Sequence, residues 1–269
     1  MLGYDFMRHA FEAASIVAVL AGIVGYLLVL RGQTFAGHAL AHIGFTGATG
    51  AVLIGVAPFA GMVVANVAAG VLMGALGEKL SERDVAIGMV LAVALGFGLL
   101  FLHFYTAFAS QATALLFGNI LAVTPATIRL MAALAALSLA LLAVIARPLL
   151  FASLQPELAE ARGVRPTLYA MLFLAIAALA TAEAAQVVGV LLVFTLLVGP
   201  AAAAQRLTVR LAAGIVLAAL LALAEAWLGI VIAYYSDWPT SFCITALSGL
   251  VYALTLLPRP QRRSAAATA

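Results

Sequence analysis

The sequence predicts an all-α polytopic membrane protein of about nine spanning helices, folded as a single domain over residues 1–269. Of the 269 residues, 66% are hydrophobic and 9% are charged, whereas a soluble domain has about 45–50% apolar and about 25% charged residues. A chain of this size cannot bury so much apolar surface in a water-exposed globule. Apolar stretches long enough to cross a bilayer recur along the whole chain. The composition therefore excludes a soluble enzyme, a disordered protein and a nucleic-acid binder.

The candidate spans are separated by charges, prolines and polar clusters, and a total of eight to ten spans fits the same pattern. The first ends at Arg31 and is too long for a cleavable signal core. The stretch 111–123 is too short to cross, and we expect a re-entrant half-helix there, which is stable only against protein or a water cavity. Cys243 is the single cysteine, which excludes an internal disulfide and a Cys-rich metal site. The nine spans are 10–30, 33–55, 59–77, 85–104, 127–146, 167–182, 186–204, 211–235 and 240–257.

The basic residues predict the orientation of the bundle in the lipid membrane through the positive-inside rule. If the tail 258–269 is cytoplasmic, only Arg8 and Arg129 of the 13 basic residues fall outside. We therefore expect the N-terminus outside and the C-terminus inside the cytoplasmic membrane of a bacterium. The residues expected inside are Arg31, Lys79, Arg83, Arg147, Arg162, Arg165, Arg206, Arg210, Arg259, Arg262 and Arg263.

The longest cytoplasmic loop, about 147–166, is predicted to contain a short surface helix. Pro156 suits the first turn of a helix, and Glu157 lies near the positive helix end. Gly163 can stop the helix, and Pro166 prevents its continuation. Two interpretations stay open from these residues alone. The loop is either a solvated connector or a docking helix for a cytoplasmic partner.

The second span carries the most informative polar residues, His38 and His42. No formal charge occurs between Gly32 and Gly77, and imidazoles there are costly unless they have partners or line a polar path. At spacing i, i+4 they share one face of the helix. Imidazole is a common ligand of borderline metals, although a hydrogen-bonded helix-packing pair has the same spacing. Three residues extend the stripe, Thr34, Thr46 and Thr49.

Other polar motifs are weaker or exclude a function. The zinc-protease motif H-E-x-x-H needs Glu after the first histidine, and Ala39 stands there instead. Glu225 lies well inside a span and is the least explained charge, whereas Glu183 and Gln186 are expected at an outer turn. Because the chain has no G-x-x-x-x-G-K-[ST] loop, any ATPase that drives transport must be another chain.

Taken together, five blocks of the sequence resemble the membrane permease of zinc/manganese-type ABC importers, and the resemblance covers nearly the whole chain. Residues 27–47 resemble the family segment Arg-x-x-x-x-x-Gly-Asp-x-x-x-His, and 187–208 resemble its Val-Gly-x-Leu-Leu…Pro-Ala-Ala block. The remaining three blocks are 82–100, 115–124 and 154–164.

The resemblance implies a type II importer permease fold with a re-entrant half-helix and a cytoplasmic coupling helix. It also implies a homodimer, two cytoplasmic ATPase subunits that bind ATP, and an extracytoplasmic metal-binding protein. The chain itself is then not an enzyme and binds no cofactor. The loop 154–164 would dock on the ATPase through Gln155, Glu157, Leu158, Ala161 and Gly163.

The resemblance places His42 on the family's metal-pathway histidine and His38 where the family usually has Asp. Imidazole nitrogens favour zinc over manganese, which prefers oxygen ligands. We therefore expect Zn²⁺ as cargo, with Mn²⁺ or iron as alternatives, at a transient site of four imidazoles from two protomers. Two other functions stay open. One is a proton-coupled secondary metal carrier that uses Glu225 and the histidines without an ATPase, and the other is an importer of an iron chelate.

Overall fold

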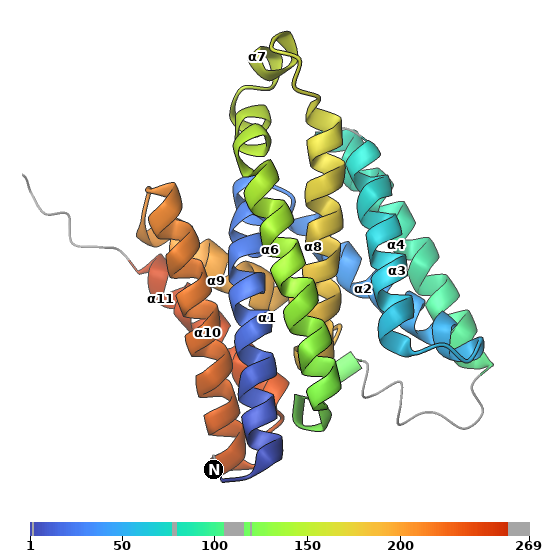
Figure 1. Ribbon diagram of the computed structural model, residues 1–269, viewed down its shortest axis with the longest axis vertical. Coiled ribbons are helices and arrows are strands. Elements are labelled where there is room, and N and C mark those ends of the chain that lie inside the picture. Colours follow the sequence, from blue (N-terminus) through green and yellow to red (C-terminus); the bar gives the residue numbers. More distant parts are fainter. Residues whose placement is uncertain (2, 77–79, 105–115, 119, 258–269) are drawn as a thin grey trace, which may run out of the picture.

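The structure is a computed structural model that describes the chain except for residues 2, 77–79, 105–115, 119 and 258–269. The described residues form helices joined by turns, with no strand among them (Figure 1). Within the described ranges, nine helices have 15 residues or more, and each corresponds to one of the nine predicted spans. These are α1 (Asp5–Leu30), α2 (Thr34–Leu53), α3 (Pro58–Ala75), α4 (Leu80–His103), α6 (Pro125–Leu154), α8 (Pro166–Val188), α9 (Val193–Leu207), α10 (Leu211–Ser236) and α11 (Thr240–Leu256). Two short helices, η1 (Ile120–Ala122) and α7 (Pro156–Ala161), lie between them.

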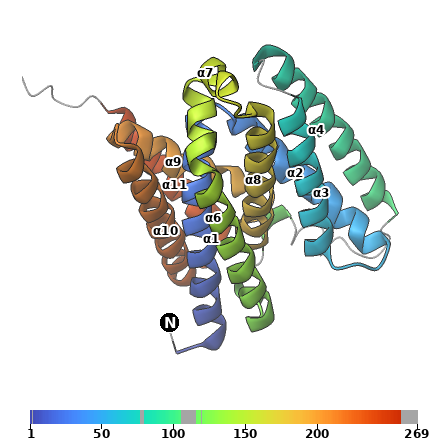
Figure 2. The ribbon, with the colours of Figure 1, turned by 45° about the horizontal axis from the view of Figure 1, so that its top comes forward.

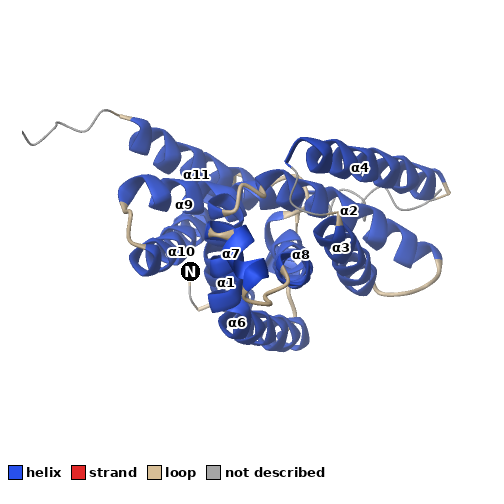
Figure 3. Cartoon of the chain, turned by 90° about the horizontal axis from the view of Figure 1, so that it is seen from above, coloured by secondary structure: helices blue, strands red, loops and turns tan. Residues whose placement is uncertain are grey.

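The bundle has a central row of α1, α6 and α8, with a group of three helices on either side. Figure 1 shows α2, α3 and α4 on one side and α9, α10 and α11 on the other. Figures 2 and 3 show that α4 lies at the outer edge, beside α2. Helix α8 packs against α3, and α1 packs against both α9 and α10. The histidine-bearing helix α2 therefore lies between the central row and α4.

Small residues determine how closely these helices approach one another. A Cβ on Gly25 of α1 would collide with the carbonyl of Leu197 in α9, and one on Gly22 would collide with the backbone of α10. On α3, Gly70 and Gly74 lie in the same way against the backbone of α8. In lipid no hydrophobic effect drives helices together, so association depends on this close van der Waals contact. The glycines therefore fix the packing of the central row against both flanking groups.

Six of the helices in the described part of the chain are long and apolar enough to cross a membrane: α1, α3, α4, α6, α8 and α10. Helix α2 has 20 residues, but its two histidines and its glycines and threonines lower its hydropathy. Helix α11 has 17 residues. Helix α9 has only 15 residues, which is about 22 Å at 1.5 Å per residue, less than the ~30 Å of a bilayer core. The helix that corresponds to the predicted span 186–204 is thus too short to cross the bilayer core on its own.

The turn before α9 lies at Gly189, so the prediction of an outer turn at Glu183 and Gln186 was wrong. Helix α8 continues through both residues to Val188. Gly189 has φ 83° and ψ 157°, a conformation that is essentially restricted to glycine. A Cβ on Gly189 would also collide with the carbonyl oxygen of Leu116. The position of the turn is therefore set by contact with a distant segment rather than by the charged residue.

That distant segment is the described part of the predicted half-helix 111–123, which comprises residues 116–118 and 120–123; residues 111–115 and 119 lie outside the described chain. The N–H of Leu191 donates to the carbonyl of Leu116 at 3.2 Å. The hydroxyl of Ser241 donates to the carbonyl of Phe117 at 2.5 Å, and Gly118 has φ 74°. The irregular backbone thus has protein partners, as the prediction for a re-entrant segment required.

The described arginines are divided between the two ends of the bundle as the sequence predicted. The end that carries α7 also holds the α1–α2 turn, the start of α8 and the α9–α10 turn (Figure 1). The opposite end holds the starts of α1 and α6, with Arg8 and Arg129. The basic residues at the α7 end are Arg31, Arg147, Arg162, Arg165, Arg206 and Arg210. Lys79, Arg259, Arg262, Arg263 and the side chain of Arg83 lie outside the described part.

We predict that Gly189→Ala destabilises the protein, because alanine strains the backbone there and its methyl group would clash with Leu116. The expected loss is about 2 kcal/mol or more, measured as a lower midpoint of thermal unfolding in detergent. Gly249→Ala is the matched control, since a Cβ at that helical position meets no atom within 4 Å and alanine favours helix. Equal midpoints for the two variants would contradict the prediction.

Candidate functional site

His38 and His42 lie together on α2, as the i, i+4 spacing predicted. Their ring centroids are 4.8 Å apart with an interplanar angle of 82°. Both side chains are half-buried, and no hydrogen bond joins either imidazole to another described residue. The predicted alternative of a hydrogen-bonded packing pair therefore has no support among the described contacts. The ring nitrogens keep their capacity to bind a ligand.

Phe194 is a neighbour of the histidine pair that the sequence did not single out. Its ring lies 5.2 Å from that of His38 at an angle of 79°. Phe194 is the second residue of α9, directly after the turn that begins at Gly189. This contact depends on where the turn lies, so no local sequence signal marks it. The aromatic ring covers one side of His38 and restricts its orientation.

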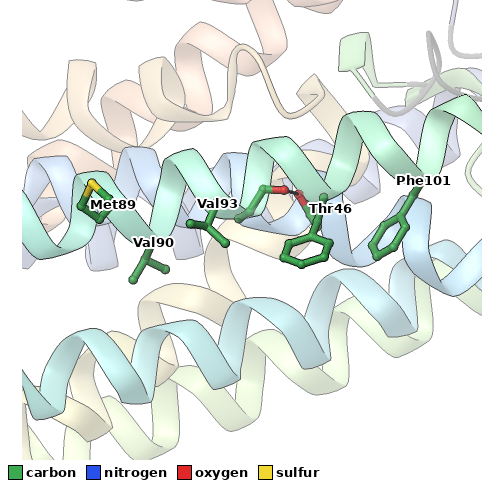
Figure 4. A pocket seen from close by; sticks show the side chains of 7 residues that line it. Thr46, Met89, Val90, Val93 and Phe101 are labelled. Carbon is green, nitrogen blue, oxygen red and sulfur yellow. Dashed lines mark hydrogen bonds between the residues drawn. The ribbon is translucent and has the colours of Figure 1, made fainter.

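The threonines that extend the polar stripe point to different partners. Thr34 begins α2 and is half-buried. The hydroxyl of Thr46 donates to the carbonyl of Ala94 in α4 at 2.6 Å (Figure 4), and that of Thr49 donates to the carbonyls of Phe45 and Thr46 on its own helix. Thr46 lines an open, apolar groove of about 490 Å³ with Met89, Val90, Val93, Ala94, Phe97 and Phe101. This groove presents carbon rather than metal ligands, so the potential metal ligands of α2 are the two histidines.

Within the described residues, no three His, Cys, Asp or Glu side chains lie close enough to hold a metal ion. The histidine pair thus provides two nitrogen donors from one chain. Tetrahedral zinc sites take four ligands, and catalytic ones take three protein ligands and a water. A metal at His38 and His42 would therefore complete its coordination with water or with groups from another chain.

Glu225 lies on α10 with Ser248 of α11 as its neighbour, whereas the two histidines lie on α2. It is 2% exposed, and neither carboxylate oxygen has a hydrogen-bond partner among the described groups. Ser248 of α11 is its polar neighbour, and the Ser248 hydroxyl donates to the carbonyl of Thr195 at 3.3 Å. Helix α9 therefore contacts His38 through Phe194 and Ser248 through Thr195.

Glu183 is a second buried carboxylate, which the sequence analysis expected at an outer turn. It is 0% exposed inside α8, and both oxygens lack a hydrogen-bond partner among the described groups. The chain thus buries two carboxylates in apolar helices, although a bare charge there is costly.

Helix α7 forms where the sequence predicted a short surface helix. Pro156 occupies its first turn and Glu157 follows. At the other end the N–H of Gly163 donates to Glu160 and that of Val164 donates to Ala159, both at 2.9 Å. These two bonds form a Schellman motif, which needs the left-handed φ of 79° found at Gly163.

The surface of α7 projects beyond the bundle at one end of the molecule (Figure 1). Ala159 is fully buried and anchors the short helix. Leu158 is 45% exposed although it is apolar, and Leu154 just before α7 is also exposed. All five predicted docking residues are exposed: Gln155, Glu157, Leu158, Ala161 and Gly163. This exposure is compatible with docking.

Comparison with known proteins places the chain in a transport family. The model of the ABC 3 transport family matches residues 3–258. The manganese transport system membrane protein MntC of Halalkalibacterium halodurans is 28% identical over 97% of this chain and 90% of its own length. A probable iron transport system membrane protein of Haemophilus influenzae is 27% identical over 95% of this chain and 94% of its own length.

Solved structures include a close match in fold. A chain in the structure of PsaBC from Streptococcus pneumoniae in complex with Fab has a TM-score of 0.85 and 26% identity, over 97% of this chain and 94% of that chain. This likeness confirms the predicted all-α permease fold. The family match spans every described helix, and the protein therefore belongs to the ABC 3 transport family.

Proposed function

We propose that the chain is the membrane permease of an ATP-driven importer of a divalent transition metal, and that His38 and His42 form part of its transit site. The observation that carries this proposal is the pair of half-buried imidazoles 4.8 Å apart in a helix without charge. Family membership supports the transport class. A permease has no ATPase motif, so hydrolysis would take place on partner subunits.

A homodimer would complete the transit site. One chain offers two imidazoles, and a second copy related by a twofold axis would bring two more to the same axis. Four neutral ligands hold a divalent ion without the compensating charge of a carboxylate. Such a site binds more weakly than a charged one, which suits a path that must release its ion.

Zinc is the cargo that the ligand chemistry favours. His38 replaces the carboxylate that the family resemblance predicts, and nitrogen ligands suit zinc better than manganese. Manganese is the second candidate, because MntC and other relatives are named as manganese transport proteins. Iron is a third candidate, because a relative from Haemophilus influenzae is named as an iron transport protein. The argument for zinc over manganese depends on the nitrogen ligand of His38. A change at His38 should therefore alter the preference between these two metals.

Helix α7 is the proposed docking site for the cytoplasmic ATPase. It is held at both ends by local signals, and it exposes Leu158 and Glu157 at the end of the bundle that is rich in arginine. An exposed leucine beside acidic groups is a surface that a partner can cover. On this proposal the α7 end faces the cytoplasm, the N-terminus lies outside, and a metal-binding protein docks at the opposite end, in the cytoplasmic membrane of a bacterium.

The secondary carrier is less well supported than the ATP-driven importer. That hypothesis needs Glu225 and the histidines in one proton relay, but the polar neighbour of Glu225 is Ser248 and no contact joins Glu225 to either histidine among the described residues. Membership of an ABC transport family also favours an ATPase partner.

We predict that His38→Ala combined with His42→Ala lowers ATP-driven uptake of labelled zinc by at least about tenfold, a typical loss when a metal site is disrupted. The measurement uses vesicles that contain the assembled transporter. His103→Ala is the control, because this histidine is exposed at the end of α4. Normal uptake by the double variant would show that the transit site lies elsewhere.

We predict that His38→Asp raises the ratio of manganese to zinc uptake by about tenfold, which corresponds to 1.4 kcal/mol. A carboxylate supplies the charge and the oxygen ligand that manganese prefers. Competition between the two labelled metals in the same vesicles measures the ratio. If the wild type already transports manganese in preference to zinc, the proposed cargo is wrong while the transit site stands.

We predict that Glu157→Ala combined with Leu158→Ala reduces co-purification of the ATPase by at least about tenfold, because exposed apolar groups at an interface centre contribute most to binding. Leu168→Ala is the matched control, since Leu168 is also 45% exposed but lies on α8. Retention of the ATPase and of ATP-driven uptake by the double variant would leave α7 as a simple connector.

A further inference from the structure

Arg31 joins three helices at the end of the bundle that carries α7. It lies in the turn between α1 and α2 and is half-buried. One guanidinium nitrogen, Nη1, donates to the carbonyl of Leu149 at 3.4 Å and to the hydroxyl of Ser153, both in the last turns of α6. The guanidinium also lies over the ring of Phe173 in α8, 5.4 Å from its centroid. The side chain therefore spans residues that are more than a hundred positions apart in sequence.

The α6 side of this junction leads directly to the docking helix. Ser153 also donates to the carbonyl of Leu149 at 2.5 Å, so the two acceptors of Arg31 belong to one hydrogen-bonded turn. Helix α6 ends at Leu154, and α7 begins two residues later at Pro156. Only Gln155 separates the two helices, so the turn that Arg31 holds lies next to the docking helix.

The α2 side of the junction leads to the histidine pair. The Nε of Arg31 donates to the side-chain oxygen of Gln33 at 3.2 Å, and Gln33 is only 4% exposed. The carbonyl of Gln33 accepts the N–H of Gly37 in the first turn of α2. His38 follows Gln33 by five residues, about 7.5 Å along a helix. The start of α2 is thus fixed to the end of α6 by one arginine side chain.

We propose that Arg31 is a positioning residue that couples movement of the docking helix α7 to the histidine pair on α2. The proposal rests on the proposed function, since it assumes that the ATPase acts on α7 and that metal passes His38 and His42. Apolar helix surfaces can slide past one another in lipid, whereas a guanidinium held by a carbonyl, a hydroxyl and an amide keeps a fixed register. Movement of the α6–α7 corner therefore draws the start of α2 with it.

The planar fork of arginine is needed for this junction. Nε and Nη1 donate in two directions, toward α2 and toward α6, while the flat face stacks on Phe173. A lysine ammonium has the charge but cannot stack and donate in this fixed geometry. Arg31→Lys should therefore restore only part of the coupling lost in Arg31→Gln.

The test compares metal uptake with ATP hydrolysis in the same vesicles of assembled transporter. For Arg31→Gln we expect the ATPase to stay bound and active while the metal moved per ATP falls by about tenfold, the ratio equivalent to 1.4 kcal/mol of lost coupling. Arg147→Gln is the matched control, because Arg147 is an exposed arginine at the same end of α6. A parallel fall of uptake and hydrolysis, or no change in either, would overturn the proposal.

Ser153→Ala tests the same coupling role if the Arg31→Gln variant does not assemble with the ATPase. It removes one acceptor of Arg31 and leaves the arginine in place, so a smaller fall in metal moved per ATP is expected. If Ser153→Ala and Arg31→Lys both keep the wild-type ratio, Arg31 has no coupling role. Failure of the proposed function is distinguished by the wild type, which would then show no ATP-driven uptake at all.

Discussion

Backbone groups that face lipid have no water to bind, so a break in a membrane helix needs partners from protein or from a water-filled cavity. In this protein the break between α8 and α9 meets that need by lying against a second irregular segment. Leu191 bonds to Leu116, and Gly189 lies against Gly118 so closely that neither can carry a side chain. This contact fixes where α9 begins. The same contact therefore sets the position of Phe194, the second residue of α9, against His38.

Scarcity of charge is the second constraint, and it acts differently on the two kinds of titratable residue. The histidines are neutral ligands when unprotonated, so they can lie half-buried in an uncharged helix without a partner charge. The carboxylates of Glu183 and Glu225 are instead buried, and their oxygens accept no hydrogen bond from the described part of the chain. The charges that would most attract a cation are thus not on the α2 face that presents the imidazoles.

Local signals in the sequence predicted much of this structure, and contacts between distant segments account for what they missed. Helix α7 is specified within ten residues by Pro156, Glu157 and Gly163, so its position and its ends were predictable. The proximity of His38 and His42 follows from helical spacing alone. The turn at Gly189 was missed because its reason lies at Leu116, more than seventy positions away. Phe194 and Arg31 depend in the same way on partners from other helices.

These long-range contacts place the histidine helix between two kinds of restraint. At its start, Arg31 and Gln33 fix α2 to the corner that leads into α7. Further along, His38 is covered by Phe194, which belongs to a helix whose start is set by the rigid turn at Gly189. One restraint is polar and attached to a projecting, exposed element, whereas the other is a contact between two half-buried rings. A movement that enters at α7 would therefore shift the start of α2 relative to α9, and so alter the environment of the imidazoles where the two helices meet.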